Sequence, residues 1–96
     1  MEVLPIGSIV LLKGASQRLI IIGRCLKTVI NEKECFFDYA GVIYPQGLLN
    51  DAAAYFNAEE IDEIFFKGYS DASDVAAVKG IRQFWKNHPE IVRGME

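Results

Sequence analysis

Few residues in this chain are of types that could perform chemistry. The single histidine, His88, could act as a general base or coordinate a metal ion through an imidazole nitrogen. No partner for it is evident in the sequence, so packing or capping at a helix end is the better interpretation. Cys25 and Cys35 together with His88 do not form a zinc motif, because structural zinc ligands come in pairs about two to four residues apart.

The two cysteines are predicted to be structural. A nucleophilic thiolate needs a nearby cation or helix N-terminus, and the adjacent Arg24 should point to the opposite face of the strand from Cys25. The two thiols could face each other across a hairpin, and their spacing permits a disulfide. Because no signal peptide is evident, we expect a cytoplasmic protein with reduced thiols.

An acidic run, Glu59, Glu60, Asp62 and Glu63, is the remaining polar cluster. A calcium loop would show regularly spaced oxygen ligands around an internal glycine, which this run lacks. We therefore expect a solvated rim, or at most an electrostatic contact for a basic partner.

Length and composition fit a single domain over residues 1–96. The 96 residues carry a net charge of -3 and are 51% hydrophobic. An acidic balance argues against binding to a nucleic-acid backbone, which requires a basic surface. The apolar runs are too short for a membrane span, so no membrane insertion is expected.

The pattern of residues predicts an α+β fold, a small curved antiparallel sheet of about four strands with a C-terminal helix packed on it. Strand-rich sequence covers 4–69, the helix covers about 71–88 after an Asp71 cap, and 89–96 form a loose tail beyond Pro89. The strands are expected at 8–13, 18–27 with an extension to residue 30, 35–44 and 63–69.

Several details of these elements can be predicted. The first two strands are apolar at odd and even positions, so both faces are covered or the strands curl around a core. In the third strand, the face that includes Asp38 is expected to be more solvated. Residues 48–56 fit either an irregular loop or one helical turn, and Asn57 and Glu60 after them are predicted to form a capping box. The helix should bury one stripe and contain a glycine, Gly80, that a close contact requires; the stripe is Val78, Ile81, Trp85, His88 and Val92.

Aromatic residues make up 11% of the chain, more than one small core readily hides. Rings near turns are plausible anchors for a protein partner, since interfaces are enriched in such side chains. The alternative is that each ring covers the core while its polar atom reaches water. The candidate partner-binding residues are Tyr44, Tyr55, Phe56, Tyr69 and Trp85.

Four segments carry a resemblance to a known family. They are LPIGSIVLLKG (4–14), IIIGR (20–24), FDYAGVIYPQG (37–47) and YFNAEEIDEIFFKGY (55–69). In order and spacing they resemble a small family of Gram-positive bacterial proteins of unknown function, encoded beside LXG-type polymorphic toxins of the type VIIb secretion system. A histidine is common in that family where Ala58 stands here.

The resemblance implies a non-enzymatic accessory protein. It would be a chaperone or targeting factor that binds an LXG-type toxin, or the toxin's small helical export partners, in the cytoplasm, without a cofactor or metal. Two alternatives stay open: an immunity protein that blocks a cognate toxin, or a small-ligand-binding domain whose pocket would involve Arg24, Asp38, Tyr39 and His88. A homodimer could form if the strand edge at 63–69 is unpaired.

Overall fold

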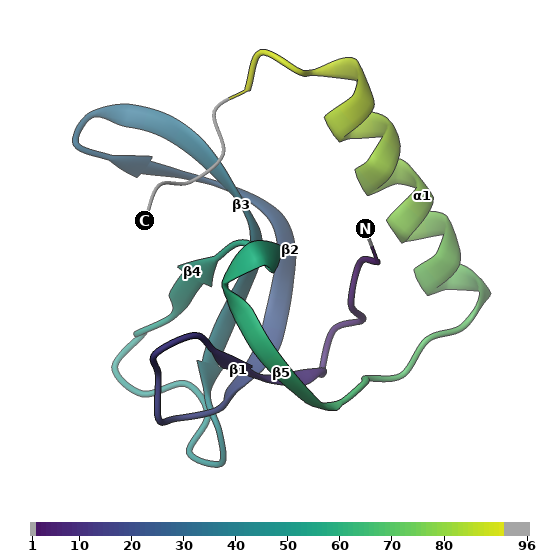
Figure 1. The fold of residues 1–96 in the computed structure, drawn as a ribbon. Helices are drawn as coiled ribbons and strands as arrows, with labels where there is room; N and C mark the ends of the chain where they lie inside the picture. Colours follow the sequence, from purple (N-terminus) through teal and green to yellow (C-terminus); the bar gives the residue numbers. More distant parts are fainter. Residues whose placement is uncertain (1, 92–96) are drawn as a thin grey trace.

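The computed structural model describes residues 2–91, which form a five-stranded antiparallel sheet and a C-terminal helix (Figure 1). This confirms the predicted α+β class, with five strands in place of four. The sheet order is β4-β3-β2-β1-β5. The elements are β1 (Ile9–Leu12), β2 (Leu19–Ile30), β3 (Lys33–Ile43), β4 (Ala54–Phe56), the short 3₁₀ helix η1 (Ala58–Glu60), β5 (Ile61–Phe66) and α1 (Ala72–Asn87).

The additional strand, β4, lies where the sequence was ambiguous. It pairs with β3 from Tyr39 opposite Phe56 to Gly41 opposite Ala54. Successive alanines favour helix locally, so β4 owes its conformation to pairing with β3 and to the burial of Phe56. The predicted capping box then follows it, because the Glu60 carboxylate accepts a hydrogen bond of 2.8 Å from the Asn57 backbone N–H.

The sheet is strongly bent along the β2–β3 hairpin (Figure 1). A bulge interrupts the register between Ile21 and Gly23, and Cys25 has a positive φ of 53°. Bulges bend a strand and increase its twist. The hairpin closes through Asn31 and Glu32, which both have positive φ, as a two-residue turn of this kind requires.

One face of the sheet holds the core. Its buried side chains come from four strands and the N-terminal segment: Leu4, Val10, Leu19, Ile21, Tyr39 and Phe56. The prediction that the apolar strands curl around a core therefore holds for this face. Because side chains alternate along a strand, the sequence neighbours of these buried residues point to the other face of the sheet.

Helix α1 begins after the predicted cap and ends before Pro89. The Asp71 carboxylate accepts hydrogen bonds from two backbone N–H groups of the first turn. The helix contains no fully buried residue, although Phe84 and Trp85 contact Phe36 of β3 with ring centroids 5.2 and 5.7 Å apart.

Two predictions about α1 are corrected by the structure. The predicted stripe is only half-buried at Val78, Ile81 and Trp85, and His88, which follows the end of the helix, is exposed; Val92 lies outside the described residues. A Cβ atom built on Gly80 would have no neighbour within 4 Å, so no close contact explains this glycine. No helix within residues 2–91 has the length and apolar character needed to span a bilayer.

Candidate functional site

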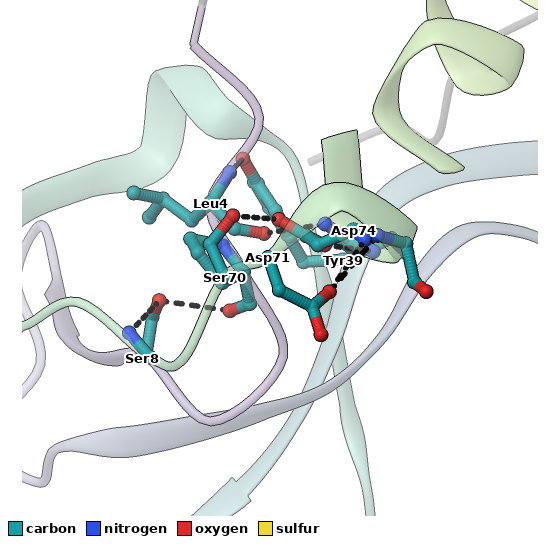
Figure 2. Close-up of polar contacts among 10 residues, drawn as sticks. Leu4, Ser8, Tyr39, Ser70, Asp71 and Asp74 are labelled. Carbon is teal, nitrogen blue, oxygen red and sulfur yellow. Dashed lines mark hydrogen bonds and ion pairs between the residues drawn. The ribbon is translucent and has the colours of Figure 1, made fainter. Parts of the chain in front are cut away.

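Polar contacts join the sheet, the N-terminal segment and α1 at one junction, where Figure 2 shows Leu4, Tyr39 and Asp74 close together. The Tyr39 hydroxyl accepts a hydrogen bond of 3.0 Å from the Leu4 backbone N–H. Arg24 donates to the Leu4 carbonyl at 3.2 Å and forms an ion pair of 2.8 Å with Asp74 in the first turn of α1. These contacts attach the N-terminal segment and α1 to β2 and β3.

Burial raises the pKa of the Tyr39 hydroxyl, so this group stays protonated at neutral pH and serves as a hydrogen-bonding group. The pKa of Asp74 is lowered, first by the hydrogen bond that Ser70 donates at 2.7 Å and then by Arg24. The raised pKa of Tyr39 and the lowered pKa of Asp74 both fit a structural role, in which Tyr39 stays neutral and Asp74 stays ionised beside Arg24.

Asp38 is buried, with 6% exposure, which corrects the expectation of a solvated face. Its carboxylate accepts a hydrogen bond of 2.8 Å from the Ala58 backbone N–H, and its own backbone N–H donates to the Asn57 side chain at 3.0 Å. The carboxylate thus joins β3 to the turn that leads into β5. Its burial reflects this turn lying over it, which strand periodicity alone does not reveal.

A hollow of about 420 Å³ lies between α1, the N-terminal segment and β3, and both Asp38 and His88 line it. A second hollow of about 530 Å³ continues along α1 and shares Val3 and Arg82 with the first. His88 contacts the exposed Glu90 carboxylate at 3.2 Å. Of the four residues considered for a ligand pocket, Asp38 and His88 therefore meet at one hollow, whereas Arg24 and Tyr39 belong to the junction.

The cysteines are unbridged and do not face each other. Cys35 lies opposite Thr28 in the β2–β3 register, three positions along β2 from Cys25. Burial, and then the negative charge of Asp38, raise the pKa of the Cys25 thiol, which opposes thiolate formation. Among residues 2–91, no three His, Cys, Asp or Glu side chains gather as metal ligands would.

The face of the sheet opposite the core is strongly apolar. The register places Phe66 opposite Ile9, Ile9 opposite Ile20 and Ile20 opposite Val42, and cross-strand partners share a face. This row crosses β5, β1 and β2 and ends at Val42 of β3, which is buried with 5% exposure. Ile20 also flanks the buried Ile21, which confirms that the row points away from the core.

The row continues to further exposed side chains. Ile22, on the other side of Ile21, is 47% exposed, and Phe65 and Phe66 are 48% and 58% exposed. A bulge in β5 explains why two adjacent rings are exposed. Ile9 lies opposite Phe66 and Val10 lies opposite Ile64, so Phe65 between them is an extra, unpaired residue. Arg18 lies at the end of the row, with its guanidinium carbon 5.0 Å from the ring centre of Tyr44 and 5.2 Å from that of Phe65.

We call this surface the open face and define it by Ile9, Arg18, Ile20, Ile22, Tyr44, Phe65 and Phe66. Residues 3–76 of the chain match the model of a family described as a domain of unknown function, DUF4176. The chain belongs to this DUF4176 family. No curated protein and no solved structure matches the chain.

The DUF4176 match includes every residue of the open face and ends in the second turn of α1. It also includes the Arg24–Asp74 pair. Trp85 and His88, which line the first hollow, lie beyond it. The open face is therefore part of the region that defines the family, whereas much of the hollow's α1 wall is not.

The predicted anchors occupy different surroundings in this DUF4176 chain. Tyr44 belongs to the open face, Tyr55 stacks on Phe37, Tyr69 is 80% exposed beside the α1 cap, and Trp85 packs against Phe36. Phe56 is a core residue with 0% exposure and offers no surface to a partner in this fold.

Sequence reasoning missed the exposed residues that surround Tyr44: Arg18, Ile22, Phe65 and Phe66. The sequence did contain an indication of this surface, because the first two strands are apolar on both faces. When one face packs on the core, the other face remains apolar. Which face stays uncovered depends on where β4, η1 and the N-terminal segment lie, and that depends on the tertiary structure.

Proposed function

We propose that this protein is a non-enzymatic accessory protein that binds another polypeptide through its open face. The observation that carries the proposal is the apolar row across β5, β1 and β2, in which Phe66 is 58% exposed and beside which Ile22 and Phe65 are about half exposed to solvent. Contiguous apolar surface of this kind is uncommon on monomeric soluble proteins and is typical of interaction sites.

The polar groups support binding over catalysis. Asp38, Tyr39 and Arg24 make hydrogen bonds that join segments of the chain, and the raised pKa of the Cys25 thiol disfavours a nucleophile. General acid–base or nucleophilic catalysis would need such groups directed at a substrate. Their structural use favours a function without bond-breaking steps.

The family resemblance suggests the partner. We propose a chaperone or targeting factor for an LXG-type toxin of the type VIIb secretion system, acting in the cytoplasm on the toxin or its small helical export partners. An elongated helical partner would supply an apolar stripe of the kind that sheet faces accept.

Co-expression with the LXG protein encoded beside it tests this proposal. We expect a stoichiometric complex during purification, weakened by Phe66→Thr and retained by Tyr69→Thr. Both substitutions remove an exposed ring, but only Phe66 lies on the open face. Normal export of the toxin from a strain lacking this protein, together with no complex, would refute the proposal.

Truncation of the toxin separates this function from that of an immunity protein. A targeting factor should bind the N-terminal export region, whereas an immunity protein should bind the C-terminal catalytic region.

The hollow lined by Asp38 and His88 supports a second candidate, binding of a small ligand. A metabolite that raises the melting temperature of the wild type, but not of an Asp38→Asn variant, would favour that candidate.

A further inference from the structure

Arg18 is the one cation of the open face, and its charge is not neutralised by a neighbour. Its guanidinium lies near the rings of Tyr44 and Phe65, and among residues 2–91 it forms no ion pair with a carboxylate. Arg24, which pairs with Asp74, lies opposite the buried Tyr39 on the core side of the sheet. Arg18 thus adds a single positive charge to an apolar surface.

The position of Arg18 is held from two directions. Its carbonyl accepts a hydrogen bond of 2.9 Å from the Tyr44 backbone N–H, which fixes the chain. The two rings contact the guanidinium and restrict the side chain. A guanidinium that packs against rings still has N–H groups at its edge, and these can bind a carboxylate in bidentate fashion.

We propose that the open face binds an amphipathic helix with an acidic residue beside its apolar stripe, the carboxylate pairing with Arg18. This inference rests on the proposed function and specifies the chemistry of the partner. The part of the row that is not buried, from Phe66 to Ile20, crosses three strands, about 10 Å at the usual strand spacing. A helix covers that length in about two turns, the span of side chains at i, i+4 and i+7.

Charge distinguishes this occupant from others. Glu63 shares the open face at the β5 edge, opposite Leu11, so a partner acidic throughout would be repelled there. A second copy of this chain packed face to face would bring two Arg18 side chains toward one apolar interface. A helix with one acidic residue near Arg18 satisfies both constraints.

The test uses three synthetic helical peptides with the same leucine stripe and either Glu, Gln or Lys at one flanking position. Fluorescence anisotropy with the full chain should give about tenfold tighter binding of the Glu peptide than of the Lys peptide. Arg18→Gln should remove this preference while the Gln peptide still binds, and Arg18→Glu should reverse it. Lys33→Glu, the same charge reversal at the β2–β3 hairpin, should leave the preference intact.

Equal affinity for the three peptides, no binding of any of them, or a preference that survives Arg18→Glu would overturn the inference. If an Arg18 variant fails to fold, the relative affinities of the three peptides for the wild-type protein still test whether the open face prefers an acidic residue. The peptides also separate this inference from the proposed function. A complex with the LXG protein that Arg18→Glu leaves unchanged would refute the inference alone, whereas a peptide preference without any LXG complex would refute the function alone.

Discussion

The junction beneath α1 and the open face differ in how their side chains are satisfied. At the junction, polar groups are bonded within the chain: the Tyr39 hydroxyl to Leu4, and Arg24 to both Leu4 and Asp74. On the open face, apolar groups such as Phe66 remain half exposed. The bonded groups that stabilise the fold are therefore separate from the surface that we propose for recognition.

The largest expected effect lies where the chain leaves β5 and passes the N-terminal segment. A Cβ atom on Gly68 would lie 2.2 Å from the Ile6 carbonyl oxygen, and the Gly68 N–H donates to the buried Ser8 hydroxyl at 3.0 Å. We expect Gly68→Ala to lower the free energy of unfolding by about 3 kcal/mol. Urea denaturation monitored by circular dichroism measures it.

Two variants serve as controls for this comparison. Gly80→Ala, in open space on α1, should raise the free energy of unfolding by about 1 kcal/mol because alanine is the better helix former. Phe66→Thr, two positions before Gly68 but on the open face, should change it by no more than about 1 kcal/mol. If Gly68→Ala were as stable as the wild type, the close approach to Ile6 would be wrong.

A second, smaller effect is expected at the turn between β4 and β5. Asn57→Ala removes the acceptor of the Asp38 backbone N–H and half of the capping box with Glu60. Loss of a buried acceptor should cost about 2 kcal/mol in the free energy of unfolding. The exposed Asn87→Ala at the end of α1 is the matched control, and an equal loss in both variants would contradict a special role for Asn57.

The hairpin turn offers a stabilising change away from both faces. Glu32 has a φ of 66°, a conformation that glycine adopts without strain. Glu32→Gly should therefore increase the free energy of unfolding by about 1 kcal/mol. Glu34→Gly, two residues later and paired with Val29 inside β3, should decrease it instead; thermal unfolding of both variants shows whether the signs differ.

The junction should loosen in acid. The folded state lowers the pKa of Asp74 below its ordinary value of 3.8, so its contribution is present above that pH and is lost as the pH falls through the folded-state pKa. We expect lower protection factors, that is, faster amide exchange relative to the intrinsic rate at the same pH, in the first turn of α1 on acidification from about pH 5 to pH 2. Asp74→Asn should abolish this step; a step of equal size in that variant would exclude the Arg24–Asp74 pair as its cause.

Local signals predicted much of the fold. The Asp71 cap, the Asn57–Glu60 capping box and the stop before Pro89 depend on a few adjacent residues, and all three are present. Strand β4 could not be predicted in this way, because Ala54, the last of three successive alanines, acquires a strand conformation only through pairing with β3.

The candidate site was less predictable than the fold. Tyr44 was identified from its place before a turn, but its association with Arg18 and Phe65 joins three separate segments. Phe56 was indistinguishable from an exposed ring until its position in the core was known. Sequence periodicity gives alternation along a strand, whereas exposure depends on which segments cover each face.

The β1–β5 register has a consequence for the behaviour of the protein at high concentration. Two extra residues, Asp62 and Phe65, interrupt the alignment of β5 with β1. A border strand so interrupted is a poor template for the backbone of another molecule. The chain can therefore carry three consecutive large apolar residues, Ile64 to Phe66, at the margin of its sheet while resisting growth into fibrils.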